Sequence, residues 1–296
     1  MRTLAAYPAL LVFFLAAATA SCQTAQSSAT AVQDRPSPWT VVDIRERQRD
    51  EVPFEESSHY LWPSPDRNSV LGPDSLRARV RIDEEHHPHL ELEDLRTGDI
   101  TPLLDASTLP HWSPDGTYIA CSHWKSQRRP WDLAVVEVAS RKLVVSPDLD
   151  ASVSLMKWSP DSRALGVAGV FYRERKSILY ALAFPAGSVA VLDTVDLVAD
   201  YNFAWSPDGR WIAFTQPTQL DHLGEDPVAA DLWIVEPATR RKWCVLETPD
   251  WIETSPLWIT NRSIQIDRTH WDGSELGVEQ RRVVELTLWE ASPTSL

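Results

Sequence analysis

The fold is decided by the stretch Trp112-Ser113-Pro114-Asp115-Gly116, which is followed by the apolar segment Tyr118-Ile119-Ala120-Cys121. A near copy, Trp205-Ser206-Pro207-Asp208-Gly209, is followed by Trp211-Ile212-Ala213-Phe214. In each copy, Pro presets the backbone for a tight turn, Asp bonds back to the main chain and Gly accepts a positive φ angle. Each copy therefore predicts a β-hairpin whose tryptophan and apolar residues pack between neighbouring sheets.

Further copies recur along the chain at a nearly constant interval. The stretch Trp158-Ser159-Pro160-Asp161-Ser162 is a third good copy, and residues 62–71 and 258–266 contain degraded versions. Successive turn residues are 49, 46, 47 and 53 positions apart in the five copies, at Asp66, Asp115, Asp161, Asp208 and Asn261. Two more strand-like runs follow each motif, so each unit has four strands. This period and strand content are typical of β-propeller blades.

The Trp-Ser-Pro-Asp-Gly…Ile-Ala-Phe pattern resembles the WD40-like (PD40) repeat of the TolB-type propellers, also found beside the catalytic domain of prolyl oligopeptidases. The resemblance covers almost the whole chain after residue 37 and implies an all-β fold, a β-propeller. Propellers of that family often have six blades, whereas five motifs start here, so we predict five four-stranded blades with six as the alternative. The last unit lacks a fourth strand, which residues 39–44 are suited to supply as its outer strand.

The N-terminus has the order of regions of a secretory signal peptide. Arg2 precedes an apolar run over residues 4–18, and the small residues Thr19-Ala20-Ser21 precede Cys22. These residues resemble a bacterial lipobox, which implies lipidation of Cys22; Thr19 departs from the usual aliphatic residue, and ordinary cleavage nearby is the alternative. We predict a signal peptide at 1–21, a flexible tether at 22–37 and the propeller at 38–296.

Composition and charge narrow the possible partners. The chain carries a formal net charge of −14, which argues against nucleic acid, because phosphate binding relies on clustered Lys and Arg. Its 3 cysteines form no disulfide framework. We expect an exported protein of the periplasm or the outer membrane, whose only membrane contact is the N-terminal lipid.

The binding face is predicted at one end of the blades. Connections from second to third strands gather there, and in this sequence they are rich in charged and aromatic residues. Blades two and three would present a basic, aromatic patch and blade four an acidic loop, which suits a protein or peptide partner in the cell envelope. Plain solvated loops are the alternative. The predicted binding residues are Trp124, Arg128, Arg129, Trp131, Tyr172, Arg173, His222, His270 and Trp271.

Two sets of residues suggest ion binding. Imidazoles and carboxylates suit divalent transition ions, so His86, His87 and His89, which follow Glu84 and Glu85, could form a metal site. One short loop rarely supplies a whole coordination shell, so we expect no resident cofactor and keep a divalent cation as the alternative. Four acids precede innermost strands and could ring the mouth of a central channel: Asp105, Asp150, Asp200 and Glu253.

Three functions are consistent with these features. The leading hypothesis is a non-enzymatic binding or scaffold module of the bacterial envelope. The second is a propeller enzyme such as a glycosidase, which would need the channel-mouth carboxylates at separations suited to acid and nucleophile or base roles. A serine hydrolase is disfavoured, because no Gly-x-Ser-x-Gly motif occurs. The third is an assembly subunit that has lost ligand binding.

Overall fold

The computed structural model contains strands and short connections. The predicted signal peptide, the tether and Cys22 lie outside the residues it describes. These contain one 3₁₀ turn, η2 (Pro73–Ser75), and no helix long and apolar enough to cross a membrane. The described residues are 38–48, 69–85, 87–105, 110–123, 132–145, 149, 151–171, 175–196, 202–220, 227–249, 251–271 and 278–290.

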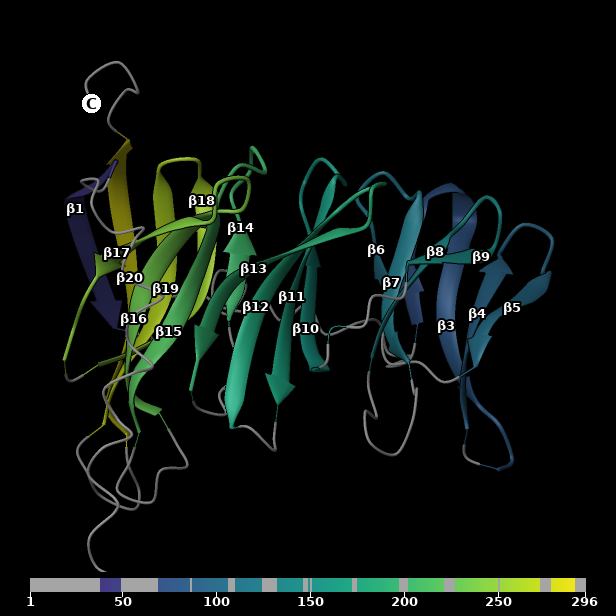
Figure 1. Ribbon diagram of the computed structural model, residues 1–296, viewed down its shortest axis with the longest axis horizontal. Coiled ribbons are helices and arrows are strands. Elements are labelled where there is room, and N and C mark those ends of the chain that lie inside the picture. Colours follow the sequence, from purple (N-terminus) through teal and green to yellow (C-terminus); the bar gives the residue numbers. More distant parts are fainter. Residues whose placement is uncertain are drawn as a thin grey trace, which may run out of the picture. The chain divides into compact units, whose positions relative to one another are not determined.

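Within the described residues, the strands fall into five groups of four (Figure 1). Three groups are separate antiparallel sheets, and the last two are joined into one eight-stranded sheet by a single parallel pair, Ala230 with Ile252. We treat each group as one blade. The first contains β2 (Ser69–Leu71), β3 (Leu76–Ile82), β4 (Pro88–Asp94) and β5 (Ile100–Asp105). The second contains β6 (His111–Trp112), β7 (Tyr118–His123), β8 (Asp132–Glu137) and β9 (Lys142–Val145). The third contains β10 (Ser152–Trp158), β11 (Ala164–Phe171), β12 (Lys176–Ala183) and β13 (Ser188–Val195). The fourth contains β14 (Phe203–Trp205), β15 (Ile212–Leu220), β16 (Pro227–Glu236) and β17 (Arg241–Leu246).

The fifth blade takes its outer strand from the beginning of the chain. It contains β18 (Trp251–Thr260), β19 (Ser263–Trp271), β20 (Val278–Glu290) and β1 (Trp39–Gln48), which runs antiparallel to β20. Trp39 is buried there, with its ring centroid 5.1 Å from that of Trp211 in the fourth blade. The prediction that residues 39–44 complete the last blade is therefore confirmed.

The repeated motif builds the same hairpin turn in three blades. The Ser113 hydroxyl donates to Asp115 Oδ1 at 2.7 Å, and the Tyr118 N–H donates back to Ser113 Oγ at 2.9 Å. The equivalent serine–aspartate bonds measure 2.7 Å in the third blade and 2.6 Å in the fourth. Gly116 and Gly209 have φ angles of 72° and 71°, as such a turn requires. The residues quoted in the motif therefore have the turn roles that the sequence predicts.

Tryptophan side chains link three of the motifs to the preceding blade. The Trp158 indole N–H donates to the His111 carbonyl at 3.0 Å, and the Trp205 N–H donates to the Lys157 carbonyl at 2.9 Å. Trp112 makes the same bond to Val70 O at 3.2 Å. Around these bonds, four clusters of buried apolar side chains lie between consecutive blades. The core is thus distributed between the sheets.

Each blade has two different ends. At the turn end, the first strand turns into the second and the third into the fourth. At the loop end, the second strand connects to the third. Turn ends of neighbouring blades lie together, because the Asp115 N–H donates to Ser162 Oγ at 3.0 Å and the Asp208 N–H donates to Asn261 Oδ1 at 3.0 Å. We call the contact between two consecutive turn ends a seam.

Candidate functional site

Most residues predicted to bind a partner lie outside the described residues. Of the binding residues, His270 is described near the loop end of β19, and the backbone of Trp271 ends that strand. The others have no described position, and neither do His86, Asp150 and Asp200. The residues not described are Trp124, Arg128, Arg129, Trp131, Tyr172, Arg173 and His222.

A tryptophan with two arginines marks the loop end of the fifth blade. The guanidinium carbons of Arg268 and Arg282 each lie 5.2 Å from the centroid of the Trp251 ring. The His270 ring meets the same indole edge-on, with the centroids 5.1 Å apart. These distances are those of cation–π and T-shaped aromatic contacts. Trp251 is half-buried, so part of its ring remains open to a partner.

A carboxylate from β1 holds both arginines in place. Glu46 Oε1 accepts a hydrogen bond from Arg268 Nη1 at 2.6 Å, and Glu46 Oε2 accepts one from Arg282 Nη1 at 2.7 Å. Arg268 is buried and Arg282 is half-buried, whereas Glu46 is an exposed residue with 30% of its side chain accessible. The cluster of Glu46, Trp251, Arg268, His270 and Arg282, which we call the Trp251 cluster, is therefore rigid but partly accessible.

Glu253 lies behind this cluster as a buried partner of Arg268. Its side chain is 0% exposed, and its Oε1 accepts bonds from Arg268 Nε at 3.0 Å and from the Thr248 hydroxyl at 2.6 Å. Burial raises the pKa of Glu253, with a smaller contribution from the charge of Asp231, although Arg268 and Thr248 oppose the shift. Among the described residues, its Oε2 has no hydrogen-bond partner. This predicted channel-mouth acid is therefore enclosed and paired.

The loop end of the first blade holds a histidine between two carboxylates. His89 Nε2 lies 2.9 Å from Asp83 Oδ2, and His89 Nδ1 lies 3.1 Å from Asp105 Oδ1. The bond to His89, helped by the His87 N–H, lowers the pKa of Asp83 to about 2, and the bond to Asp83 raises the pKa of His89. Asp105 is 98% exposed. Both ring nitrogens of His89 are thus engaged by carboxylates.

The predicted metal site is not assembled by the residues that the structure describes. The exposed His87 side chain lies 3.8 Å from Asp83 and 3.7 Å from Glu85, and His89 is engaged as above. Within those residues, no group of three or more histidines, cysteines and acids is placed to hold a metal ion. His86 lies outside them, so the metal hypothesis stays a prediction.

Two basic groups lie on first strands. The Lys157 ammonium donates to the Phe203 carbonyl at 2.6 Å and lies 5.6 Å from the centroid of the Phe203 ring. Burial lowers the pKa of Lys157, and burial followed by the charge of Lys157 lowers the pKa of His111. The sequence analysis did not predict basic side chains on the first strands. It predicted only acids at the positions that precede them.

The comparisons with known proteins concern the fold. No model of a known protein family matches the chain, and neither does any curated protein. The crystal structure of the tricorn protease matches with a TM-score of 0.51 and 12% identity, over 68% of this chain and 23% of that one. The β-propeller domain of the Trilobed protease from Pyrococcus furiosus, described as having an open velcro topology, matches with a TM-score of 0.49 and 15% identity, over 72% and 70%.

The fold is a β-propeller. TolB from Acinetobacter baumannii is also similar, with a TM-score of 0.42 and 19% identity over 75% of this chain. The chain spans 55% of TolB and 23% of the tricorn protease, so these likenesses concern one part of each protein. At 12% identity the tricorn match supports the predicted propeller fold alone, and none of these matches carries an activity over to this chain.

The Trp251 cluster was missed by the sequence reasoning. Arg268 and Arg282 stand within strands whose apolar pattern marks them only as half-exposed positions. One signal was available, since pairing residues 39–44 with the last strand brings the following Glu46 level with Val284, close to Arg282. A carboxylate of one strand beside an arginine of its partner is a pair that a sequence can suggest once the register is known.

Proposed function

We propose that the protein is an exported, lipid-anchored β-propeller that binds a protein or peptide partner of the bacterial cell envelope at its loop end. The Trp251 cluster is the observation that carries this proposal. Tryptophan and arginine are the residues that most often dominate the energy of protein interfaces, above all where packing holds them in desolvated surroundings. Here one half-buried tryptophan stands against two arginines.

The cluster is prepared for binding before a partner arrives. Glu46 bridges Arg268 and Arg282, and Glu253 holds Arg268 from behind. Immobilising long side chains costs binding free energy, about 0.5 to 1.5 kcal/mol for each. Because the ion pairs already restrict these arginines, a partner avoids most of that cost.

Charge of both signs at the loop end supports a polypeptide partner. The first blade presents the exposed carboxylate of Asp105, and the fifth presents Arg282. The connections of blades two to four carry the predicted residues, from Trp124 to His222, that would extend this face. Complementary charges of both signs fix the orientation of a partner and speed its association.

The N-terminal sequence supports the cellular setting. Its apolar run and the small residues before Cys22 resemble those of an exported bacterial lipoprotein. The tether at 22–37 has the polar composition of a flexible linker. Such a linker would allow the propeller to reach a partner beside the membrane.

Capture from solubilised envelope tests the proposal. The mature wild-type protein is compared with Trp251→Ala and with the triple variant Trp124→Ala, Arg128→Ala, Trp131→Ala. Loss of a buried aromatic anchor at an interface costs 2 kcal/mol or more, so a partner held by the wild type should bind at least about 30-fold more weakly to either variant.

The fifth blade supplies a matched control. Trp289 is 55% exposed at the turn end and also has an arginine, Arg262, 5.5 Å from its ring. Trp289→Ala should retain the partner as well as the wild type does. Equal retention by all four proteins, or no specific partner for the wild type, would contradict the proposal.

A further inference from the structure

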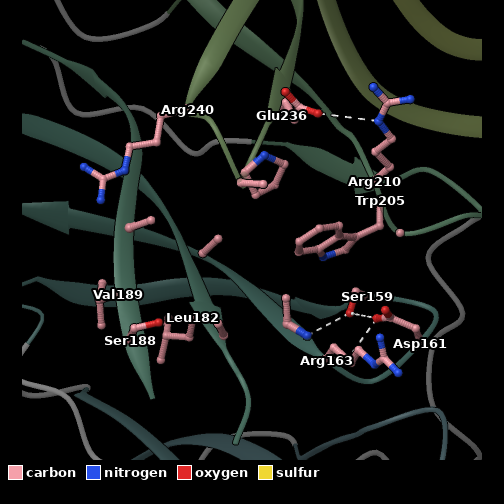
Figure 2. Close-up of a pocket in the computed structure, with 17 residues that line it drawn as sticks. Ser159, Asp161, Arg163, Leu182, Ser188, Val189, Trp205, Arg210, Glu236 and Arg240 are labelled. Atoms are coloured by element: carbon pink, nitrogen blue, oxygen red, sulfur yellow. Dashed lines mark hydrogen bonds and ion pairs between the residues drawn. The ribbon is translucent and has the colours of Figure 1, made fainter. Parts of the chain in front are cut away.

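A pocket opens at the seam between the third and fourth blades. It has a volume of about 470 Å³ and lies at the turn end, opposite the proposed binding face (Figure 2). Its apolar lining comes from Trp205, from residues 181–183 of β12 and from residues 188–190 of β13. Its charged lining consists of Asp161, Arg163, Arg210, Glu236 and Arg240.

The seam that holds the pocket lacks a hydrogen bond that links the turns at two other seams. In those seams a turn aspartate donates its N–H to the side chain of Ser162 or Asn261 in the next blade. At the third seam the residue in the place of Ser162 is Gly209, which has no side chain to accept the N–H of Asp161. A Cβ atom on Gly209 would lie 3.6 Å from the Asp161 carboxylate, which is ordinary contact distance. The two turns are therefore adjacent at this seam, but Gly209 offers no side chain to link them.

A second link is also missing. In the first seam Arg141 Nη1 donates to Thr101 Oγ1 at 2.9 Å. Arg240 occupies the same turn position in the fourth blade, since Arg141 and Arg240 have φ angles of 59° and 60° and close equivalent turns onto Glu137 and Glu236. Thr101 stands three residues after Gly98, and the residue three after the equivalent Gly187 is Ala190. Ala190, which lines the same pocket, therefore has no hydroxyl to accept a bond from Arg240.

The acids of the pocket are already committed within the fold. Asp161 Oδ1 accepts bonds from the Ser159 hydroxyl at 2.7 Å and from the Arg163 N–H at 3.0 Å, which shape the turn. Glu236 lies 3.5 Å from Arg210 Nε and accepts the Thr239 hydroxyl at 2.6 Å. Two carboxylates are thus occupied, and one of them already pairs with an arginine.

The guanidinium groups of Arg163 and Arg240 remain for a ligand. Neither makes a side-chain hydrogen bond or an ion pair with the part of the chain that the structure describes, and the charge of Arg163 acts on the nearby Asp161 carboxylate. Figure 2 shows them on opposite sides of the pocket, with the Trp205 ring pointing into the space between. In a chain of net charge −14, two such arginines around an apolar floor favour a ligand with separated negative charges and an apolar body.

We propose that this pocket binds a short acidic segment of another protein. An apolar side chain of that segment packs on Trp205 and the alanines of β12 and β13, and carboxylates on either side pair with Arg163 and Arg240. The wall formed by β13 favours an extended peptide, because β13 is the last strand of its sheet and pairs only with β12 among the described strands. The site is separate from the loop end, so the protein would contact two partners, or two parts of one.

Binding of defined peptides tests this inference. The probes are fluorescein-labelled pentapeptides with a central Leu, Phe or Trp and Asp or Glu on both sides, measured by fluorescence anisotropy. Matched peptides carry Gln in place of each acid. We expect the acidic set to bind the wild type and the Gln set to bind at least about tenfold more weakly, since charge-assisted bonds supply the difference. The double variant Arg163→Ala, Arg240→Ala should lose the same factor.

Gly209→Asn tests the pocket without touching an arginine. Ser162 fills this turn position in the third blade at a φ angle of 62°, and asparagine tolerates a positive φ better than most residues do, so the variant should fold. Its amide should close the seam and abolish peptide binding. Arg141→Ala is the matched control and should bind as the wild type does, as should Trp251→Ala.

Two results would overturn the proposal: no acidic peptide binding more tightly than its Gln counterpart, or binding that survives both Gly209→Asn and the double arginine variant. Thermal unfolding of each variant verifies that it is folded. Because Trp251→Ala abolishes only the loop-end partner, failure of this inference remains distinguishable from failure of the proposed function.

Discussion

Removing one indole N–H should measure how strongly a motif tryptophan ties two blades together. Trp158→Phe keeps an aromatic ring against Tyr118 and Phe184, whose centroids lie 5.9 and 4.9 Å from that of Trp158. It deletes the 3.0 Å bond to the His111 carbonyl. The variant therefore separates the hydrogen bond from most of the packing.

The magnitude follows from two terms. The smaller ring gives up roughly 40 Å² of apolar contact, worth about 1 kcal/mol at about 25 cal/mol per Å². A buried carbonyl that loses its donor adds about 1 to 2 kcal/mol. We expect Trp158→Phe to lower the free energy of unfolding by about 2 to 3 kcal/mol.

Trp258 provides the control within the same repeat series. It is buried at the equivalent position of the fifth blade, but its Nε1 has no hydrogen-bond partner among the described residues. Trp258→Phe loses the same contact area and removes a buried, unpaired donor, whose desolvation costs about 1 to 3 kcal/mol. The two terms nearly cancel, so this variant should change the free energy of unfolding by less than about 1 kcal/mol.

Urea unfolding followed by far-ultraviolet circular dichroism measures both variants under the same conditions. A difference of about 2 kcal/mol with unchanged denaturant dependence is the expected result, and it corresponds to several degrees in Tm for a domain of this size. Equal destabilisation by the two substitutions would refute the reasoning, because the hydrogen bonds between blades would then contribute nothing beyond contact area.

Three further predictions concern ionised groups and the N-terminus. The contact of His89 with Asp83 should stabilise the protein fully below the ordinary histidine pKa of about 6.5 and fade as pH rises through the raised pKa of His89. The Tm advantage of wild type over His89→Gln should therefore shrink from pH 6 to 9, and it should also shrink below pH 4, as Asp83 nears its pKa of about 2. A Tm difference that stays constant with pH would contradict this prediction. Arg268→Met should leave Glu253 without its cation and lower the free energy of unfolding by about 3 to 5 kcal/mol at pH 8. The loss should be smaller at pH 5, because the raised pKa of Glu253 favours uptake of a proton there. An equal loss at both pH values would show that Glu253 is not the responsible group. Cys22→Ala should move the protein from the membrane to the soluble fraction of the cell envelope, and retention in the membrane fraction would rule out anchoring through Cys22.

The hairpins were predictable because their information is local. Within five residues, the motif contains the turn-forming proline, the aspartate that accepts the serine hydroxyl and the glycine with positive φ. Its recurrence then predicts the blades, and the missing strand of the last unit points to residues 39–44 as the partner of β20. These inferences use pattern and strand count, which survive wide divergence of the remaining residues.

The sites were not predictable to the same degree because they join distant residues. Glu46 and Arg268 meet only after β1 has been placed on β20, and their pairing depends on the register along both strands. The pocket depends on a smaller difference, a glycine at 209 where the third blade has Ser162. In the sequence, Gly209 simply matches the motif better than Ser162 does. Nothing in that match indicates that the seam beside Gly209 lacks a hydrogen bond.

The position of β1 also constrains the order in which the molecule can fold. Trp39 pairs opposite Glu290, so β1, the first described strand, can pair only after β20, the last described strand, is available. Contacts between such distant segments form slowly, because a very long loop has to close before they contribute any stability. In the export that we propose, β1 would leave the membrane before the other strands and remain an unpaired edge until the fifth blade emerges. Completion of the final sheet is therefore expected to be the slow step of folding, and the interval before it is when the nascent protein most needs protection from aggregation.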